Sequence, residues 1–230
     1  MERDFILVNL TVKDAETKAV YQTTVEEVAR EASIYSENAV YTPILVLPGE
    51  SRLFPKLLER LLSASEGEKF EIVLEPEDAY GEYDRNKVKV YSIRKLEREG
   101  IHPHVGETVY LDNQRGVVQS VTGGRVTVDF NHPLAGKKLL IECEVVRRIS
   151  DDLEKIRAIV ADAFDLNPEE ISANWLEEGF AEVNLPAKAY VLRDSYSRKL
   201  NALSLIMRHL KGVRKVRFVE DFEIPRKEAT

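Results

Sequence analysis

The chain has 230 residues, a length that permits one large domain or two to three small ones. Hydrophobic residues make up 43% and charged residues 32%, which is typical of globular and not of disordered proteins. The formal charge of −7 argues against a nucleic-acid partner, because phosphate binding requires a concentrated basic face. The single cysteine excludes an intramolecular disulfide and a cysteine-based metal site within this sequence.

The sequence also bears on location. No apolar run approaches the ~20 residues that span a bilayer. The start of the chain at Met1–Asp4 carries acidic residues and does not have the pattern of a secretion signal. We therefore expect a cytoplasmic protein without a membrane partner.

The first segment predicts a hairpin and a short helix. Phe5–Val12 is rich in apolar and β-branched residues, so it indicates a buried strand, and a charged turn connects it to a second strand at 19–22. Thr24 with Glu27 three residues later matches a capping box, which predicts that a helix over 25–32 begins there.

The next elements predict the rest of a sheet and its helix. Pro43–Leu47 indicates a strand, and leucines at helical spacing predict a helix over Leu53–Leu62. Glu68–Leu74 returns to strand alternation. The last strand, Leu139–Val146, alternates so that Cys143 falls on its apolar side, and we expect Cys143 to be a small core residue and not a reactive thiol.

The segment between Asp84 and Asp129 is too long for a turn and predicts a small inserted domain. It contains a helix pattern at 92–97 and strand patterns at 108–111, 116–121 and 125–130, with a hairpin signal at Gly123-Gly124. So few residues cannot bury a large core, so some apolar side chains are expected at the surface. The candidates are Val88, Val90, Tyr91, Ile93, Leu96, Ile101, Val105 and Val109. The alternative is that half or more of these form the core of the insert.

The pattern changes again from Asp151. A helical period runs to Phe164, followed by strand patterns at 171–176 and 180–185. Asp194 is then expected to cap a helix that ends near Gly212, and 213–219 indicates a final strand. This order predicts a compact α+β domain of the αββαβ type over 151–230.

Three motifs carry a resemblance to a known family. They are Pro76-Glu-Asp-Ala-Tyr80-Gly-Glu-Tyr-Asp84, Asp129-Phe-Asn-His-Pro-Leu-Ala-Gly136 and Leu140-Ile-Glu-Cys-Glu-Val-Val146. Together they resemble the FKBP-type peptidyl-prolyl isomerases, most of all the SlyD-like and long archaeal members, which carry an insert-in-flap domain.

The resemblance implies a fold and a domain plan. The expected fold is α+β, with an FKBP-like antiparallel sheet wrapped on one helix, a small mostly-β insert and a C-terminal α+β domain. The isomerase domain would be discontinuous, at 1–84 and 129–150, with the insert at 85–128. In the family this insert holds unfolded clients. A C-terminal domain of this kind occurs in long archaeal members.

The resemblance also implies site residues. Tyr80 matches the family tyrosine whose hydroxyl bonds the substrate carbonyl, and Leu53 and Phe54 match the pair before the central helix that meets the peptide. These three are the candidate catalytic residues. The candidate substrate-binding residues are Tyr21, Gln22, Ile44, Leu57 and Ile141. An alternative for Tyr80 is that its ring only anchors the turn.

Several positions depart from the family pattern. Val12 stands where the family usually has a tyrosine, and Gln22 where it has an aspartate. The family commonly has an aromatic residue at the position of Ile44, tryptophan or leucine at that of Leu57, and phenylalanine or tyrosine at that of Ile141. In the family that tyrosine holds the aspartate. Both partners are absent here, so no buried charge is left unpaired, and we expect a stable fold with weakened catalysis.

The histidines are weak candidates for a metal site. His102 and His104 flank Pro103, but two ligands make half a site, no acidic partner is spaced to join them, and we expect a solvated turn. His132 is expected to orient its loop and His209 to lie on an exposed helix face. We therefore expect neither a metal nor a cofactor.

Two functions from different classes remain open at this point. The first is a chaperone and isomerase whose insert captures unfolded, proline-containing polypeptides for a slow catalytic pocket. The second is a holdase or peptide-binding protein without catalysis on the same scaffold. A homodimer through the C-terminal domain is a further possibility.

Overall fold

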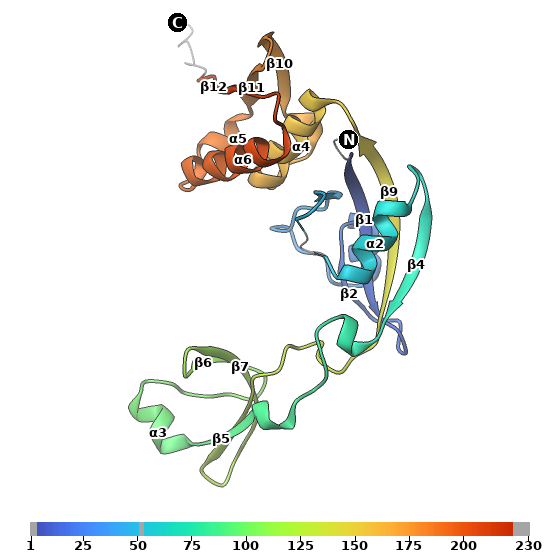
Figure 1. Cartoon of the computed structure of the whole chain (residues 1–230). Coiled ribbons are helices and arrows are strands. Elements are labelled where there is room, and N and C mark those ends of the chain that lie inside the picture. Colours follow the sequence, from blue (N-terminus) through green and yellow to red (C-terminus); the bar gives the residue numbers. More distant parts are fainter. Residues whose placement is uncertain (1–3, 51–52, 223–230) are drawn as a thin grey trace, which may run out of the picture. The chain divides into compact units, whose positions relative to one another are not determined.

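The computed structural model describes residues 4–50 and 53–222 (Figure 1). The chain divides into two compact units, the first with residues 1–13, 17–72 and 140–230 and the second with residues 14–16 and 73–139. The acidic start at Met1–Arg3, on which the expected location rests in part, lies outside the described residues. The three-part domain plan stays a prediction.

A five-stranded sheet underlies the first unit. Its strands run in the order β2-β1-β9-β4, and β3 also pairs with β1. The strands are β1 (Phe5–Asp14), β2 (Val20–Thr23), β3 (Ile44–Val46), β4 (Lys69–Leu74) and β9 (Leu139–Ile149). Helix α2 (Pro55–Ser63) lies along this sheet in Figure 1 and buries Leu57 and Leu61. The mixed α+β class with antiparallel sheets is thus confirmed.

Helix α2 begins two residues later than the leucine spacing predicted. Pro55 occupies its first turn, and Phe54 is the N-cap with an extended ψ of 139°. Proline disfavours the helical conformation in the residue before it but fits the first helical position, so the helix begins at Pro55. Leu53 and Phe54 therefore precede the helix, as the family resemblance implies.

The predicted capping box at Thr24 is wrong. Helix α1 (Glu26–Glu31) has Val25 as its N-cap, without a side-chain cap. The Thr24 hydroxyl instead accepts a hydrogen bond from the Leu10 backbone N–H at 2.9 Å. It also donates to Asn9 Oδ1 at 3.2 Å. A threonine side chain next to a strand finds backbone and side-chain partners there, and those partners replace the cap.

The second unit contains a four-stranded sheet in the order β5-β8-β7-β6. Its elements are β5 (Val88–Ser92), α3 (Ile93–Arg98), β6 (Thr108–Leu111), β7 (Gln114–Thr122) and β8 (Arg125–Asp129). The hairpin at Gly123-Gly124 is confirmed, because both glycines have positive φ, as a tight two-residue hairpin requires. Strand β5 was not predicted. A small core of this unit contains Leu96, Val109, Leu111, Val118, Val126 and Val128.

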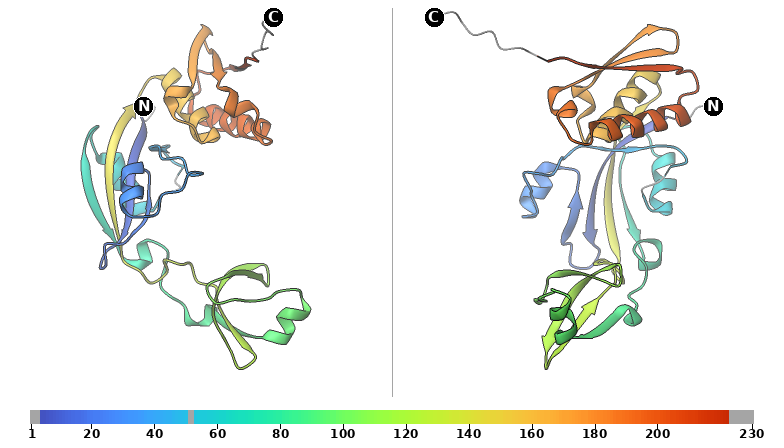
Figure 2. Two further views of the ribbon diagram at one scale, coloured as in Figure 1. Left: turned by 180° about the vertical axis from the view of Figure 1, so that it is seen from behind. Right: turned by 90° about the vertical axis from the view of Figure 1, so that its left-hand side faces the viewer.

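The C-terminal part of the first unit is a three-stranded sheet with helices. Its elements are α4 (Asp152–Phe164), β10 (Ser172–Glu177), β11 (Phe180–Leu185), α5 (Ala187–Tyr190), α6 (Ser195–His209) and β12 (Lys215–Glu220). Strands β11 and β12 are parallel, which requires the crossover that α5 and α6 provide. Figure 2 shows α4 and α6 below this sheet. Asp194 precedes α6 but does not cap it through its side chain, because its carboxylate instead accepts from Arg198 Nε at 2.9 Å.

The hydrophobic core of the first unit runs from the FKBP-like sheet into the C-terminal helices. Phe5, Leu45 and Leu47 from β1 and β3 belong to the same buried cluster as residues of α4 and α6, such as Ile159 and Leu205. No helix among the described residues is long and apolar enough to cross a membrane.

Cys143 lies in the core, 5% exposed, on β9. Its burial raises the pKa of the thiol to about 12. Because the thiolate is the reactive form, only roughly one thiol in ten thousand is ionised around pH 8. We expect native protein to resist iodoacetamide at this pH and denatured protein to be labelled fully, as measured by mass spectrometry. Rapid labelling of the native protein would show an accessible thiol.

Candidate functional site

Tyr80 lies in a tight turn of the second unit. The turn follows a short 3-10 helix at Pro76–Asp78, and the Gly81 N–H donates to the Pro76 carbonyl at 2.7 Å. Gly81 has a φ of +81°, a conformation that glycine adopts without strain. Tyr80 is 37% exposed, so its side chain is neither in the core nor fully in solvent.

The ring of Tyr80 stacks on His132. The two ring centroids are 3.8 Å apart and the planes lie at 7°. His132 Nδ1 accepts a hydrogen bond from the Leu134 backbone N–H at 3.1 Å, which fixes the imidazole in its own loop. Burial, together with the nearby charge of Arg115, lowers the pKa of His132 below its usual range. The neutral imidazole is therefore the form present at pH 7.

The Asn131 side chain and one backbone hydrogen bond join the Tyr80 turn to the Asn131-His132 turn. The Asp84 N–H donates to Asn131 Oδ1 at 3.0 Å, and Asn131 Nδ2 donates to the Asp84 carbonyl at 2.9 Å. The Gly136 N–H donates to the Gly81 carbonyl at 2.8 Å. We call this set of bonds, with the Tyr80–His132 stack, the turn clasp. Two of the sequence motifs that carried the resemblance thus meet in one structure.

Gly136 shows how closely the two turns approach. A Cβ atom at this position would lie 2.9 Å from Tyr83 Cβ, and the φ of Gly136 is +73°. Both facts require glycine here. The Tyr83 hydroxyl donates to Asp129 Oδ2 at 2.8 Å. Burial alone would raise the pKa of Asp129, but hydrogen bonds from Asn131, Tyr83 and Gln119 lower it, so the carboxylate stays ionised.

The other candidate site residues lie in the first unit and differ in exposure. Leu57 and Ile141 are both 1% exposed and belong to the core. Tyr21, Leu53 and Phe54 are half-buried, as is Ile44, whereas Gln22 is exposed. Ile141 and Leu57 therefore contribute to core packing, and the side chains accessible to a peptide are those of Gln22 and the half-buried residues.

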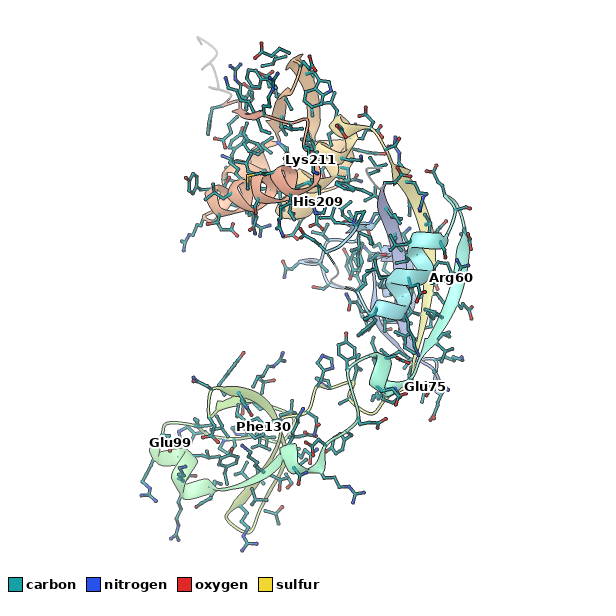
Figure 3. The ribbon with its side chains drawn as sticks, in the orientation of Figure 1. Arg60, Glu75, Glu99, Phe130, His209 and Lys211 are labelled. Atoms are coloured by element: carbon teal, nitrogen blue, oxygen red, sulfur yellow. The ribbon has the colours of Figure 1, made fainter. Side chains whose placement is uncertain are left out.

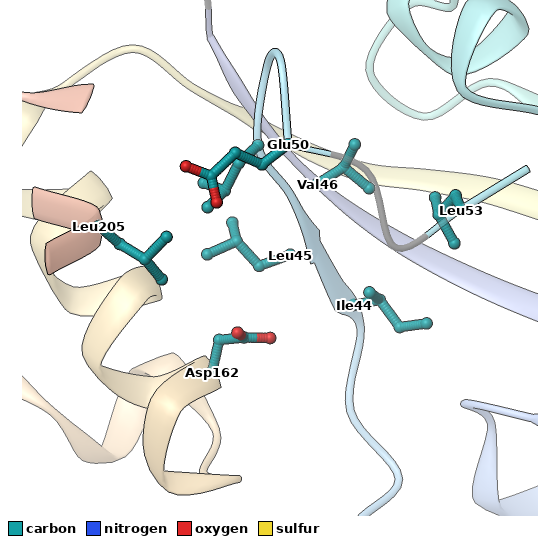
Figure 4. A pocket seen from close by; sticks show the side chains of 8 residues that line it. Ile44, Leu45, Val46, Glu50, Leu53, Asp162 and Leu205 are labelled. Atoms are coloured by element: carbon teal, nitrogen blue, oxygen red, sulfur yellow. The ribbon is translucent and has the colours of Figure 1, made fainter. Parts of the chain in front are cut away.

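Ile44 and Leu53 share a pocket of about 300 Å³ (Figure 4). The same pocket is lined by Asp162 from α4 and Leu205 from α6. Sequence reasoning missed both of these residues. They are distant in the chain from Ile44 and Leu53, and only the packing of the C-terminal helices on β3 brings them close. The remaining candidate site residues do not line this pocket.

Val12 and Gln22 are directly opposite each other. They are Cα partners in the antiparallel pairing of β1 with β2, next to a register shift between Val12 and Lys13. Opposed residues in such a ladder project to the same face of the sheet. Val12 is 8% exposed, so an apolar side chain fills its place, and Gln22 points to solvent.

Five of the eight apolar candidates of the insert lie in its core or pack against it, two are exposed, and Val88 is half-buried. Leu96 and Val109 are in the core, and three more pack partly against it: Tyr91, Ile93 and Ile101. The alternative that half or more of the candidates form the core of the insert is thus confirmed. Val90 and Val105 are 61% and 66% exposed.

Tyr110 joins the exposed group, at 73%. It lies in β6 between buried Val109 and Leu111, so it projects to the opposite face of the sheet. Val90, next to partly buried Tyr91, projects away from the core in the same way. Strand alternation alone could have identified Tyr110.

Two expectations about the histidines are wrong in part. His104 does have an acidic neighbour, because its Nδ1 lies 3.2 Å from Glu107 Oε2, three residues on. The turn is still solvated, with the His104 side chain 81% exposed. His209 is not on an exposed face, since its side chain is only 13% exposed and packs edge-on against Phe5. Figure 3 labels His209 at the end of α6.

Comparisons with known proteins agree with the motifs. Residues 89–134 match the family model described as FKBP26, IF domain. The chain is 30% identical over 126 residues to a short-type peptidyl-prolyl cis-trans isomerase of Methanocaldococcus jannaschii, covering 55% of this chain and 80% of the relative.

Two SlyD proteins, named as FKBP-type peptidyl-prolyl cis-trans isomerases, also match. That of Pasteurella multocida is 35% identical over 128 residues, covering 54% of this chain and 63% of the relative. That of Helicobacter pylori is 31% identical over 128 residues, covering 53% of this chain and 68% of the relative. With its two motifs joined in the turn clasp and this coverage of its relatives, the chain belongs to the FKBP-type peptidyl-prolyl cis-trans isomerases.

Proposed function

We propose that this isomerase binds unfolded polypeptides through the insert at 85–128 and catalyses X-Pro isomerisation at a site that includes Tyr80. The isomerase domain would comprise residues 1–84 and 129–150, with the C-terminal domain at 151–230. The observation that carries the proposal is the turn clasp, which holds the ring of Tyr80 against His132 in a defined orientation. We place the activity in the cytoplasm.

The reaction requires a surface and not a nucleophile. Rotation about the X-Pro amide has a barrier of ~18–20 kcal/mol, and no covalent bond is made or broken. The twisted amide loses resonance and much of its dipole, so apolar walls favour it over the planar ground state. Half-buried side chains such as Tyr21, Ile44 and Phe54 would supply these walls.

Hydrogen bonds would keep the peptide in register. By the family resemblance, the Tyr80 hydroxyl would donate to a substrate carbonyl, and the backbone at Leu53 and Phe54 would meet the peptide. Phe54 is the N-cap of α2 with an extended backbone, and its carbonyl accepts the first helical hydrogen bond, from the Leu58 N–H at 2.9 Å. Leu57 and Ile141 would support the walls from the core.

Catalysis would be attenuated at the opposed pair Val12 and Gln22. By the resemblance, this pair replaces a tyrosine and an aspartate that faces the rotating amide. Val12 and Gln22 are Cα partners, which supports the view that the two replacements together remove one tyrosine–aspartate interaction. An apolar Val12 needs no polar partner and Gln22 reaches water, so the change costs little stability.

NMR exchange spectroscopy on short prolyl peptides tests the catalytic half. We expect turnover below that of a SlyD relative. Tyr80→Phe is expected to lower kcat/KM about five-fold, because one neutral hydrogen bond of ~1 kcal/mol is lost while the ring stack remains. Tyr83→Phe is the matched control, since that neighbouring hydroxyl binds Asp129.

The same assay separates the alternatives. Unchanged kcat/KM in Tyr80→Phe, with loss of stability in Tyr80→Ala, would mean that Tyr80 only anchors its turn. Full SlyD-like turnover by the unaltered protein would contradict attenuation.

The second candidate function is a holdase without catalysis. The exposed Val90 and Tyr110 on the insert, together with the Val12 and Gln22 replacements, favour it. A refolding reaction limited by proline isomerisation distinguishes the two functions. A holdase suppresses aggregation without accelerating refolding, whereas the isomerase accelerates refolding at substoichiometric amounts.

Clients and self-association complete the proposed partners. Apolar side chains that the fold leaves exposed suit unfolded, proline-containing chains. Helix α6 exposes Tyr196, Leu200 and Met207, at 71%, 49% and 74%, at spacings that place them on one side of the helix. This stripe is the surface we propose for a homodimer through the C-terminal domain. The net negative charge favours neither nucleic acid nor anionic membrane.

A further inference from the structure

A tight turn after β3 determines where Glu50 lies. Gly49 has a φ of +82°, Pro48 precedes it, and the Glu50 N–H donates to the Leu47 carbonyl at 3.2 Å. Proline followed by a positive-φ glycine is the signature of a type II turn. The Glu50 side chain is therefore held at a defined distance from the end of β3.

The carboxylate of Glu50 contacts two cationic or ionisable groups at the end of α6. Its Oε1 lies 2.6 Å from Arg208 Nη1 and 3.1 Å from His209 Nε2. His209 is itself fixed, because its ring packs edge-on against Phe5, with 5.6 Å between the ring centroids at 89°. We call these contacts the Glu50 clasp. A helix of the C-terminal part thus holds the turn that follows β3.

The Glu50 clasp borders the pocket that contains candidate substrate residues. Glu50, Ile44 and Leu53 line this pocket on one side and Leu205 of α6 on the other. Figure 4 shows Glu50 and Leu205 projecting toward the same space as Leu45. Leu53 lines the same pocket as Glu50, so the contacts that hold Glu50 also hold one wall of the space that Leu53 borders.

We propose that Glu50 is a positioning residue for the prolyl site. Through Arg208 and His209 it couples helix α6 to the Leu53 wall, so that the C-terminal part of the chain holds the substrate cleft in its binding shape. Glu50 does not touch the reacting amide. This inference rests on the proposed function, which places Leu53 at the substrate.

Substitution of Glu50 and its partner tests this coupling. Glu50→Gln keeps the shape of the side chain but removes its charge, and we expect KM for a short prolyl peptide to rise about three- to fivefold while kcat stays within twofold. The melting temperature is expected to change little, because the pair is partly exposed. Arg208→Glu is expected to raise KM similarly, and the double variant Glu50→Arg with Arg208→Glu to recover most of the loss.

The pair Arg217–Glu182 gives a matched control. Its charged atoms lie 3.2 Å apart, its side chains are 53% and 21% exposed, and it lies in the C-terminal sheet away from the turn. Arg217→Gln is expected to leave KM unchanged. A rise in KM in this control equal to that in Glu50→Gln, or no rise in Glu50→Gln, would overturn the proposal.

An NMR titration of peptide binding distinguishes failure of the Glu50 coupling from failure of the proposed function. If Tyr80→Phe lowers turnover and Glu50→Gln changes neither KM nor Kd, only the coupling fails. If the unaltered protein binds the peptide without turnover, the Kd ratio of Glu50→Gln to wild type decides the coupling. If it neither binds nor turns over the peptide, both proposals fail.

Discussion

Replacing Val90 and Tyr110 together by lysine is expected to weaken the binding of an unfolded client by roughly 30- to 700-fold. Both side chains project from the outer face of the insert sheet, at 61% and 73% exposure. Burying one such side chain against a client contributes about 1–2 kcal/mol, and every tenfold in affinity corresponds to ~1.4 kcal/mol. Two lysines remove this gain and add charge to the face.

The positions of Val90 and Tyr110 on the insert sheet support a role in client binding. Val90 lies on β5 and Tyr110 on β6, the two edge strands of the order β5-β8-β7-β6. Half-buried Val117 and Thr127 lie between them on the inner strands, each next to a core residue of its own strand. Val90 is paired with Thr127 and Tyr110 with Arg115, so the two side chains lie diagonally on one face of the sheet, on edge strands that are ~14 Å apart.

Fluorescence anisotropy with a permanently unfolded, labelled client measures the effect. Because both positions are exposed, the double variant should keep its melting temperature. The control is Val40→Lys with Val191→Lys, which has the same charge change at 54% and 70% exposure in the first unit. Equal weakening by both double variants would mean that net charge, and not this face, governs capture.

Phe5→Ala is expected to lower the free energy of unfolding by about 3–5 kcal/mol. Phe5 is 2% exposed and stands in the cluster that joins β1 and β3 to α4 and α6. Besides the edge of His209, the ammonium of Lys155 lies 5.5 Å from its ring. Removing the ring leaves a cavity between the FKBP-like sheet and the C-terminal helices, which can only partly collapse.

Two natural probes make this experiment informative. Trp175 is the single tryptophan of the chain and lies on β10 in the C-terminal part, whereas Cys143 lies on β9 of the FKBP-like sheet. If the shared core makes these parts one cooperative unit, tryptophan fluorescence and cysteine labelling will report the same urea midpoint, and Phe5→Ala will lower both together.

A substitution in the core of the insert is the control for Phe5→Ala. Leu96→Ala removes a fully buried side chain from the core of the insert, in the second unit. It is expected to leave the midpoints of Trp175 and Cys143 unchanged. Separate midpoints for the two probes in the unaltered protein would show that residues 151–230 unfold independently, as the three-part domain plan predicts.

Local sequence chemistry was sufficient for most elements. The strand alternation at Leu139–Val146 predicted β9 and the core position of Cys143, because the two-residue period fixes which side chains face inward. Gly123-Gly124 predicted its hairpin, since only a few residues tolerate two positive φ values in succession. The capping box at Thr24 failed because a neighbouring strand offered its hydroxyl better partners.

What the sequence by itself determined is the family, the element order and the Tyr80 and Asn131-His132 motifs, all of which depend on short spacings along the chain. Only the tertiary structure decided which distant residues meet: Tyr80 stacking on His132, Asp162 and Leu205 beside Ile44 and Leu53, and Glu50 on Arg208. The physical reason is that such contacts depend on how helices and sheets pack, and one apolar face can pack against several partners with similar energy. No local sequence pattern determines which of these partners an apolar face packs against.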